Sequence, residues 1–300
     1  MIARVTTSAA PRPLKGILLV VLATLAFAVA DTITKQQTTR HPVAVVLAMR
    51  YLVNVFLLTL FLGPRLGSGL WRVKRRWLAM LRGLCLALGA LTAGLALRVM
   101  PVGETVAIIY LSPIMVMLLA IPLLGERPGL AGWVGAALGF AGVVLIVRPG
   151  AGLDPVGVVL ALTNACLGTG YHLLTRYLAF TETTVALLYQ TALVGAAIFC
   201  VMALGSLDGL AVNGTDFVMM LLLGTFMTIG HFMFTAAYRE APASLLAPIN
   251  YLHVFWAGGL GLLIFGHLPD HWSLLGMALV CASGAVVAFR AFRDAKDVEA

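Results

Sequence analysis

The apolar residues of this 300-residue chain fall into ten blocks, and this pattern limits the fold more than any other feature. A helix rises about 1.5 Å per residue, so a block of roughly 20 residues matches the roughly 30 Å hydrocarbon core of a bilayer. No block alternates polar and apolar residues with period two, which argues against a transmembrane barrel. The expected spans are residues 15–37, 43–63, 77–99, 102–122, 131–148, 155–178, 184–204, 216–238, 243–265 and 272–291.

The composition agrees with a chain embedded in lipid. Hydrophobic residues make up 61% of the chain and charged residues 11%, whereas soluble domains average roughly 45–50% and 25%. The segments between the blocks are too short to form a soluble domain, so we expect the chain to act within the membrane. A net charge of +8 would indicate a nucleic-acid partner in a soluble protein. We expect no such partner here, because the basic residues follow the expected membrane topology.

The distribution of basic residues predicts which side of the membrane each loop occupies. Cytoplasmic loops are enriched in Lys and Arg, and a cytoplasmic N-terminus with ten spans satisfies this rule. Both termini are then expected to be cytoplasmic in a multi-pass inner-membrane protein. The basic loop 72–76 could bind anionic lipid headgroups, although the topology alone explains its charge. Arg82 lies near this loop, so we expect it to snorkel to the headgroups without a role in the site. The cytoplasmic set is Arg4, Arg12, Lys15, Arg65, Arg72, Lys74, Arg75, Arg76, Arg127, Arg176, Arg239, Arg290, Arg293 and Lys296.

The second half of the chain repeats the first at an offset of 141 residues. The stretch YLSPIMVMLLAIPLLGERPG, which begins at Tyr110, matches YLHVFWAGGLGLLIFGHLPD, which begins at Tyr251, at its Tyr-Leu, Gly and Pro positions. Matches of Arg, Pro, Tyr and loop Gly are harder to attribute to the biased composition than matches of Leu or Ala. The same offset pairs Gly16 with Gly157, Thr34 with Thr175, Arg98 with Arg239, Pro101 with Pro242 and Gly125 with Gly266.

Each half, residues 15–148 and 155–291, contains five expected spans. Because five is odd, the second half enters the membrane from the opposite side. The sequence therefore predicts an all-α integral membrane protein of ten transmembrane helices, arranged as two inverted five-helix repeats. Such repeats recur in transporters, where the two halves exchange conformations and expose a central site to each side in turn. A duplicated scaffold without transport is the alternative.

The first half carries a family resemblance. Its end, PVGETVAIIYLSPIMVMLLAIPLLGERPG followed by GWVGAALGFAGVVLIVRPG, resembles the EamA repeats of the drug/metabolite transporter superfamily, and the resemblance covers nearly all of residues 15–291. The second half departs from the pattern at one turn, where it has Gly266-His267 instead of Gly-Glu. The strongest matching positions are Glu104 after Pro101, Pro113, the turn Gly125-Glu126-Arg127 and the run Arg148-Pro149-Gly150.

The resemblance implies a transporter of a small organic metabolite. We expect an amino acid or a related amphipathic solute to cross the inner membrane by alternating access. The direction of transport stays open, and export is one candidate. A riboflavin-like uptake transporter is the alternative that the family implies. A non-transporting scaffold and an intramembrane enzyme are less favoured, and a homodimer is compatible with the sequence.

Three charged residues within the spans are candidates for gating or coupling, because charges in lipid are costly and tend to be functional. Asp31, Arg50 and Glu104 should lie at similar depths in the outer half of the membrane. They could form a structural ion cluster that holds helix ends together. Alternatively, a carboxylate in a low-dielectric site could bind and release a proton during transport.

A second set of polar residues lies near mid-depth, where substrate sites form between the halves of such folds. The offset pairs His253 with Ser112 and Tyr251 with Tyr110, so each half contributes one position of each pair. We expect His253 and Ser112 to face inward and the tyrosines to make lateral contacts. The candidate solute-binding residues are His253, Ser112, His231, Asn164, Tyr110 and Tyr251.

The motifs of the main enzyme classes are missing from the sequence. We find no HExxH, GxSxG, GxGD or nucleotide-binding GxxxxGK[ST], and therefore expect neither an enzyme nor a bound cofactor. The histidines have no third ligand at a suitable spacing, so we expect no metal site. The cysteines lie inside spans without a CxxC motif, and we expect them to serve as small packing residues.

Overall fold

The computed structural model describes residues 13–112, 114–116, 118–119, 130–148, 152–178, 181–206, 211–240 and 249–299. All regular structure in these residues is helical, which confirms the all-α part of the expected fold. The helices are α1 (Pro13–Arg40), α2 (Val43–Leu66), η1 (Gly67–Leu70), α3 (Arg76–Val99), α4 (Val102–Ile109), α6 (Leu130–Val147), α7 (Pro155–Leu178), α8 (Thr184–Leu204), α9 (Gly214–Glu240), α11 (Leu252–Phe265) and α12 (His271–Glu299). Positions named above that lie outside the described residues are Arg4, Arg12, Pro113, Gly125, Glu126, Arg127, Pro149, Gly150 and Pro242.

Six of the described helices are long and apolar enough to cross a bilayer. They are α1, α2, α3, α7, α8 and α9, whose membrane-capable segments run from 21 to 28 residues. Trp133–Val147, Leu252–Phe265 and His271–Val286 form shorter apolar helices. Large apolar side chains point outward, including Trp77 and Leu263, each 81% exposed. An apolar exterior of this kind fits contact with lipid and not with water.

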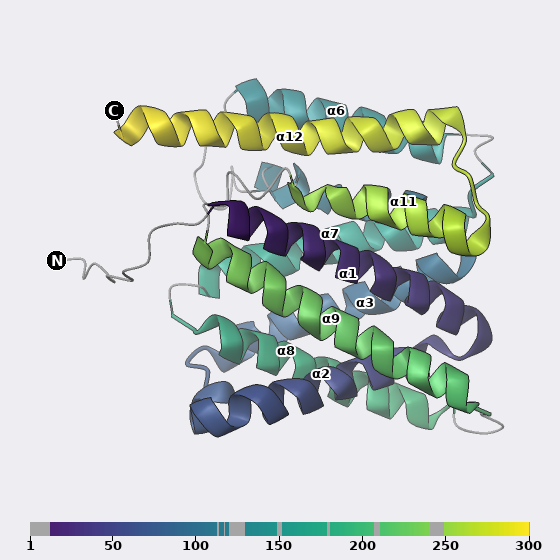
Figure 1. The fold of residues 1–300 in the computed structure, drawn as a ribbon, viewed down its shortest axis with the longest axis vertical. Coiled ribbons are helices and arrows are strands. Elements are labelled where there is room, and N and C mark those ends of the chain that lie inside the picture. The colour runs from purple at the N-terminus through teal and green to yellow at the C-terminus, as the bar shows by residue number, and fades with distance from the viewer. Residues whose placement is uncertain are drawn as a thin grey trace.

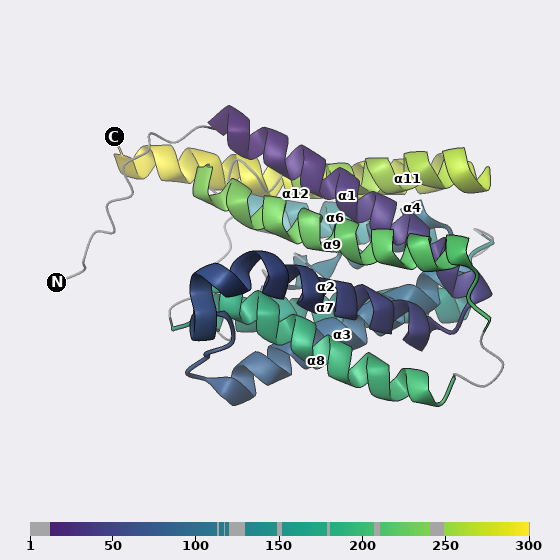
Figure 2. The same cartoon turned by 60° about the horizontal axis from the view of Figure 1, so that its bottom comes forward.

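The helices lie roughly side by side, with α6 and α12 at one end of the longest axis and α2 and α8 at the other (Figure 1). Helix α1 begins and helix α12 ends at the same end of the bundle. Close packing joins α1 to α9, α3 to α7, α2 to α8, and α6 to α12. Figure 2 shows the α1–α9 pair from a second direction.

The packing pairs follow the sequence offset. At 141 residues, α1 corresponds to α7, α2 to α8, α3 to α9 and α6 to α12. The contact of α1 with α9 then corresponds to that of α7 with α3. The α2–α8 and α6–α12 contacts each join an element to its own counterpart.

Helices α6 and α12 approach closely because small residues line their contact. A Cβ built on Gly142 would lie 2.6 Å from the carbonyl oxygen of Gly276. The Ser283 hydroxyl donates a hydrogen bond of 2.6 Å to the carbonyl of Gly135. At the 141-residue offset, Gly142 corresponds to Ser283 and Gly135 to Gly276. The Gly142–Gly276 contact and the Ser283–Gly135 contact are therefore equivalent. Small residues that allow backbones to meet are typical of helix interfaces in membranes.

The junction of α11 and α12 shows how local sequence ends one helix and starts the next. Gly266 has a φ of 66° and its N–H bonds the Leu262 carbonyl, a left-handed cap that favours glycine. Asp270 then accepts the Ser273 N–H at 2.8 Å and pairs with Arg148. The Ser273 hydrogen bonds, with the help of Arg148, lower the pKa of Asp270 to about 2. Asp270 therefore stays ionised as the N-cap of α12.

Candidate functional site

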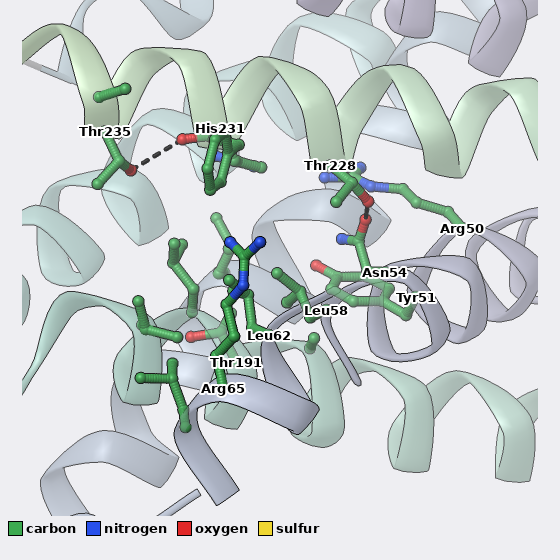
Figure 3. Close-up of a pocket in the computed structure, with 17 residues that line it drawn as sticks. Arg50, Tyr51, Asn54, Leu58, Leu62, Arg65, Thr191, Thr228, His231 and Thr235 are labelled. Carbon is green, nitrogen blue, oxygen red and sulfur yellow. Dashed lines mark hydrogen bonds between the residues drawn. The ribbon is translucent and has the colours of Figure 1, made fainter. Parts of the chain in front are cut away.

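A cavity of about 310 Å³ lies between helices from both halves of the chain. Helices α2 and α3 of the first half and α8 and α9 of the second provide its walls (Figure 3). Its volume is at the lower end of the range for small-molecule sites, which are roughly 300–1,000 Å³. The lining residues are Arg50, Tyr51, Asn54, Leu58, Leu62, Arg65, Leu66, Leu86, Val185, Leu188, Thr191, Ala192, Thr228, His231, Phe232, Thr235 and Ala236.

The cavity occupies one end of the bundle. On α2 the lining runs from Arg50 to Leu66 at the helix end, about 24 Å at 1.5 Å per residue. On α9 it covers the second part of the helix, and on α8 the first part. These segments all lie on the side of the bundle at which α1 begins (Figure 1). The cavity therefore extends from that end to beyond mid-depth. Arg65, an exposed residue, marks the outer part of the cavity.

The charged lining residues are both arginines. Arg50 lies deep on α2 with 8% of its surface exposed, and its Nε is buried without a hydrogen-bond partner. Its guanidinium carbon lies 5.2 Å from the centre of the Tyr51 ring. Figure 3 shows Arg50 reaching toward the part of α9 that bears Thr228, and Arg65 extending from the end of α2 toward α9. The described lining contains no Asp or Glu to balance these charges.

Arg82 lies beside the cavity and overturns an expectation. It does not reach the headgroups but is 3% exposed, because polar groups on α7 and α8 hold its guanidinium inside the bundle. It donates to the Thr175 hydroxyl at 2.7 Å and to the Thr191 hydroxyl at 2.6 Å. It also donates to the Leu187 carbonyl at 3.0 Å and to the Tyr171 hydroxyl at 2.7 Å. Arg82 therefore joins α3 to both α7 and α8.

A second polar cluster joins α1, α4 and α11. Nε2 of His253 lies 3.2 Å from a carboxylate oxygen of Asp31, although not at the angle of a hydrogen bond. Nδ1 of His253 lies 3.3 Å from the Tyr110 hydroxyl, which donates to the Asn250 carbonyl at 3.0 Å. The Tyr110 and Tyr251 rings are 5.1 Å apart. Three of the predicted binding residues thus lie in one cluster with one predicted coupling residue, Asp31.

Phe27 on α1 connects this cluster to the cavity. Its ring centre lies 6.0 Å from that of His253 and 5.0 Å from that of His231. His231 lines the cavity, whereas His253 does not. The two histidines are therefore separated by one aromatic ring. A displacement of α1 would act on both.

The other two predicted binding residues lie at contacts of α7, where hydrogen bonds use their polar atoms. The Ser112 hydroxyl lies 3.3 Å from that of Thr169 on α7. The Asn164 amide donates to the Gly89 carbonyl on α3 at 2.6 Å. The contact of Ser112 with α7 corresponds, at the 141-residue offset, to the contact of His253 with α1. Equivalent positions in the two halves thus make polar contacts with different partners.

The three predicted coupling residues do not form one cluster. Asp31 faces His253, and Glu104, which is 2% exposed, meets His267 at 3.0 Å. No ion pair or hydrogen bond joins Arg50 to another described residue. The partners differ because helix rotation places Arg50 on the cavity side of α2, away from both carboxylates.

The end of the bundle opposite the cavity is held by buried polar contacts. Asp216 at the start of α9 lies 2.9 Å from His41, and the two side chains are 5% and 6% exposed. Gln37 also donates to Asp216, at 3.3 Å, and Lys35 donates to the Leu97 carbonyl at 2.9 Å. By contrast, the Lys15–Glu240 pair at the cavity end is exposed. Polar contacts at the end opposite the cavity therefore join α1 to both α9 and α3.

Several of these residues were not anticipated from the sequence. Asp216 and His41 stand at expected helix ends, where polar residues are ordinary, so sequence position alone gave no signal. One signal was available for the cavity, since the 141-residue offset pairs Arg50 with Thr191 and both line it. No group of three or more His, Cys, Asp or Glu residues suited to a metal ion occurs in the described part of the chain.

Comparison with known proteins supplies the family. The EamA-like transporter family matches residues 14–148. A riboflavin transporter of Rhizobium johnstonii is 30% identical over 283 residues, which cover 92% of this chain and 91% of that protein. The chain belongs to the EamA-like transporter family. With its membrane-capable helices, it is a multi-pass membrane protein.

Another relative is named for a different solute. A pseudopaline exporter of Pseudomonas aeruginosa is 25% identical over 276 residues, covering 88% of this chain and 93% of that one. A solved crystal structure with 22% identity covers 91% of this chain and 95% of its own, with a TM-score of 0.64. At that identity the likeness shows a shared fold alone.

Proposed function

We propose that this EamA-like protein moves a small amphipathic metabolite across the inner membrane by alternating access. The observation that carries the proposal is the cavity between α2, α3, α8 and α9, which extends from one end of the bundle to beyond mid-depth. Buried polar contacts around Asp216 hold the opposite end. A site accessible from one end and closed at the other is what one state of an alternating-access transporter requires.

The proposed architecture has ten spans in two inverted repeats, residues 15–148 and 155–291. The exchange of packing pairs under the 141-residue offset supports this arrangement. The reciprocal contacts of Gly142 with Gly276 and of Ser283 with Gly135 support it at the level of single residues. In an inverted repeat, the two halves can exchange conformations, so that the closed end opens as the cavity end closes.

We assign the cavity end to the cytoplasmic side because of the basic loop residues. The exposed residues Arg72, Lys74, Arg75 and Arg76 follow α2, whose end lines the cavity. The positive-inside rule assigns that end to the cytoplasm, together with both termini. The structure then corresponds to the inward-facing state.

The Asp31–His253 pair is the proposed coupling element. It joins α1 to α11, and its side chains are 18% and 12% exposed, so a change in proton occupancy would alter an interaction between the two halves. Phe27 links the pair to His231 in the cavity. Movement of the solute and of a proton would thus act on the same helix.

An amino acid or a related amphipathic solute is the first candidate for the cargo, because the cavity combines apolar walls with a few polar groups. Riboflavin uptake is the second candidate. The observation that favours it is the likeness to the riboflavin transporter over 92% of this chain.

Reconstitution tests the proposal. Purified protein in liposomes should accumulate or release at least one solute from a pool of amino acids, dicarboxylates, phosphorylated sugars, nucleosides, polyamines and riboflavin, relative to protein-free liposomes. A pH gradient should change the rate if a proton is coupled. The proposed function would be contradicted if the protein, in either orientation, neither accumulated nor released any solute of the pool.

A further inference from the structure

Arg50 is a buried positive charge for which the described residues provide no negative partner. Its guanidinium is buried in the membrane-spanning part of α2, and no described carboxylate pairs with it. An arginine has five N–H donors and no acceptor, and it remains charged in proteins. A buried charge normally persists only where a partner compensates for its lost hydration.

Three carboxylates inside the bundle pair with histidines and not with Arg50. Asp31 faces His253, Glu104 meets His267, and Asp216 meets His41 at the closed end of the bundle. The polar neighbours of Arg50 in the cavity are neutral, and two of them, Asn54 and Thr228, bond to each other. The hydroxyl of Tyr51 is buried without a partner in the same region. Donors therefore outnumber acceptors at the deep end of the cavity.

We propose that Arg50 binds an anionic group of the transported solute, a carboxylate or a phosphate. The inference rests on the proposed transport function and adds the chemical class of the solute. A guanidinium binds carboxylate and phosphate oxygens through two parallel N–H donors, which gives both strength and orientation. Tyr51 follows Arg50 in the sequence, and its hydroxyl is a second donor to the anionic group of the solute.

The rest of the cavity defines the other features of the solute. Leu58, Leu62, Leu188 and Phe232 form apolar walls that suit a hydrophobic body. Arg65 stands in the outer part of the cavity, and Arg82 lies behind Thr191 with its donors bound to protein groups. Their positive potential attracts an anion toward Arg50. The solute is thus an amphipathic organic acid, including an amino acid with its carboxylate directed to Arg50, and not a neutral flavin.

The first experiment compares what proteoliposomes accumulate from a defined mixture of amino acids, dicarboxylates, phosphorylated sugars, nucleosides, polyamines and riboflavin. The solutes enriched over protein-free liposomes should all carry a carboxylate or a phosphate. Arg50→Gln should lower their accumulation by about tenfold or more, because it removes charge-assisted hydrogen bonds. Arg50→Lys should retain part of the activity, since it keeps the charge. Arg98→Gln, which changes an exposed arginine outside the cavity, should behave like the parent.

The outcomes separate this inference from the transport proposal. Accumulation of neutral or cationic solutes alone, or unchanged accumulation of anions by Arg50→Gln, would overturn the anion site while leaving transport intact. If no solute accumulates, transport fails, and binding tests the site on its own. The purified parent protein should then bind 3-phenylpropionate more tightly than 3-phenylpropionamide, and Arg50→Gln should lose that preference. Equal binding of the two probes by the parent, or binding of neither, would refute the anion site.

Discussion

Two buried arginines allow a direct comparison between a structural and a functional charge. Arg82 and Arg50 are 3% and 8% exposed, and both lie on membrane-spanning helices. Arg82 donates four hydrogen bonds to groups on α7 and α8, whereas Arg50 donates none to a described residue. Replacement by Met, which has a similar length and no charge, should therefore lower stability at Arg82 but not at Arg50.

The structure gives the size of the difference. In Arg82→Met, the hydroxyls of Thr175 and Thr191 keep their bonds to carbonyls within their own helices, so only the Tyr171 hydroxyl loses its partner. An orphaned buried hydroxyl costs about 1–3 kcal/mol, and each hydrogen bond from a charged donor contributes about 1.5–3 kcal/mol. Relief of the guanidinium's desolvation offsets part of this loss. A net loss of about 3 kcal/mol corresponds to a fall of about 6–12 °C in the melting temperature.

Arg50→Met should instead leave the melting temperature unchanged or raise it, because it removes a buried charge and orphans no group. The assay is thermal unfolding of detergent-purified protein, followed by tryptophan fluorescence at one fixed scan rate, since membrane proteins often unfold irreversibly. Arg98→Met is the exposed control. An equal fall for the Arg50 and Arg82 variants would refute the reasoning, because it would mean that Arg50 is retained for stability.

Three further predictions concern coupling, packing and topology. Asp31→Asn should flatten the pH dependence of net transport while solute exchange is less affected; an unchanged pH profile would exclude Asp31 as the coupling group. Gly142→Val should lower stability by about 1–3 kcal/mol or more, because its Cβ would lie 2.6 Å from the Gly276 carbonyl oxygen; thermal unfolding tests this, with a parent-like melting temperature as the contrary result. In a background without the native cysteines, a membrane-impermeant thiol reagent should label Ala211→Cys in intact cells and not Lys74→Cys. The reverse labelling pattern would contradict the assigned orientation.

The helical architecture follows from sequence because length, hydropathy and repeat offset are local or linear properties. The offset between Tyr110 and Tyr251 also anticipates which helices play equivalent roles, and the packing pairs agree with it. The segments 113, 117, 120–129 and 241–248 lie outside the described residues, so the ten-span count stays a prediction. Six helices reach membrane-spanning length in the described part.

Side-chain partners were harder to predict, because they depend on how each helix rotates about its axis. Asp31 and Arg50 were expected at similar depth, yet one faces His253 and the other faces the cavity. Arg82 was expected at the headgroups because of its distance along the chain from the basic loop. The hydroxyls of Tyr171, Thr175 and Thr191 hold it inside the bundle instead, and nothing in the local sequence of α3 reveals them.

The most direct test of the account asks whether the solute passes through the cavity between α2, α3, α8 and α9. Leu188→Cys places a thiol on the cavity wall, and Lys74→Cys places one on an exposed loop outside it. Proteoliposomes of each variant, in the cysteine-free background, are treated with a bulky methanethiosulfonate reagent and then assayed for the solute that the parent accumulates. The account predicts that transport by Leu188→Cys is blocked and is restored by a reductant, while Lys74→Cys is labelled without loss. Full transport by the labelled Leu188→Cys protein would contradict the claim that this cavity is the pathway.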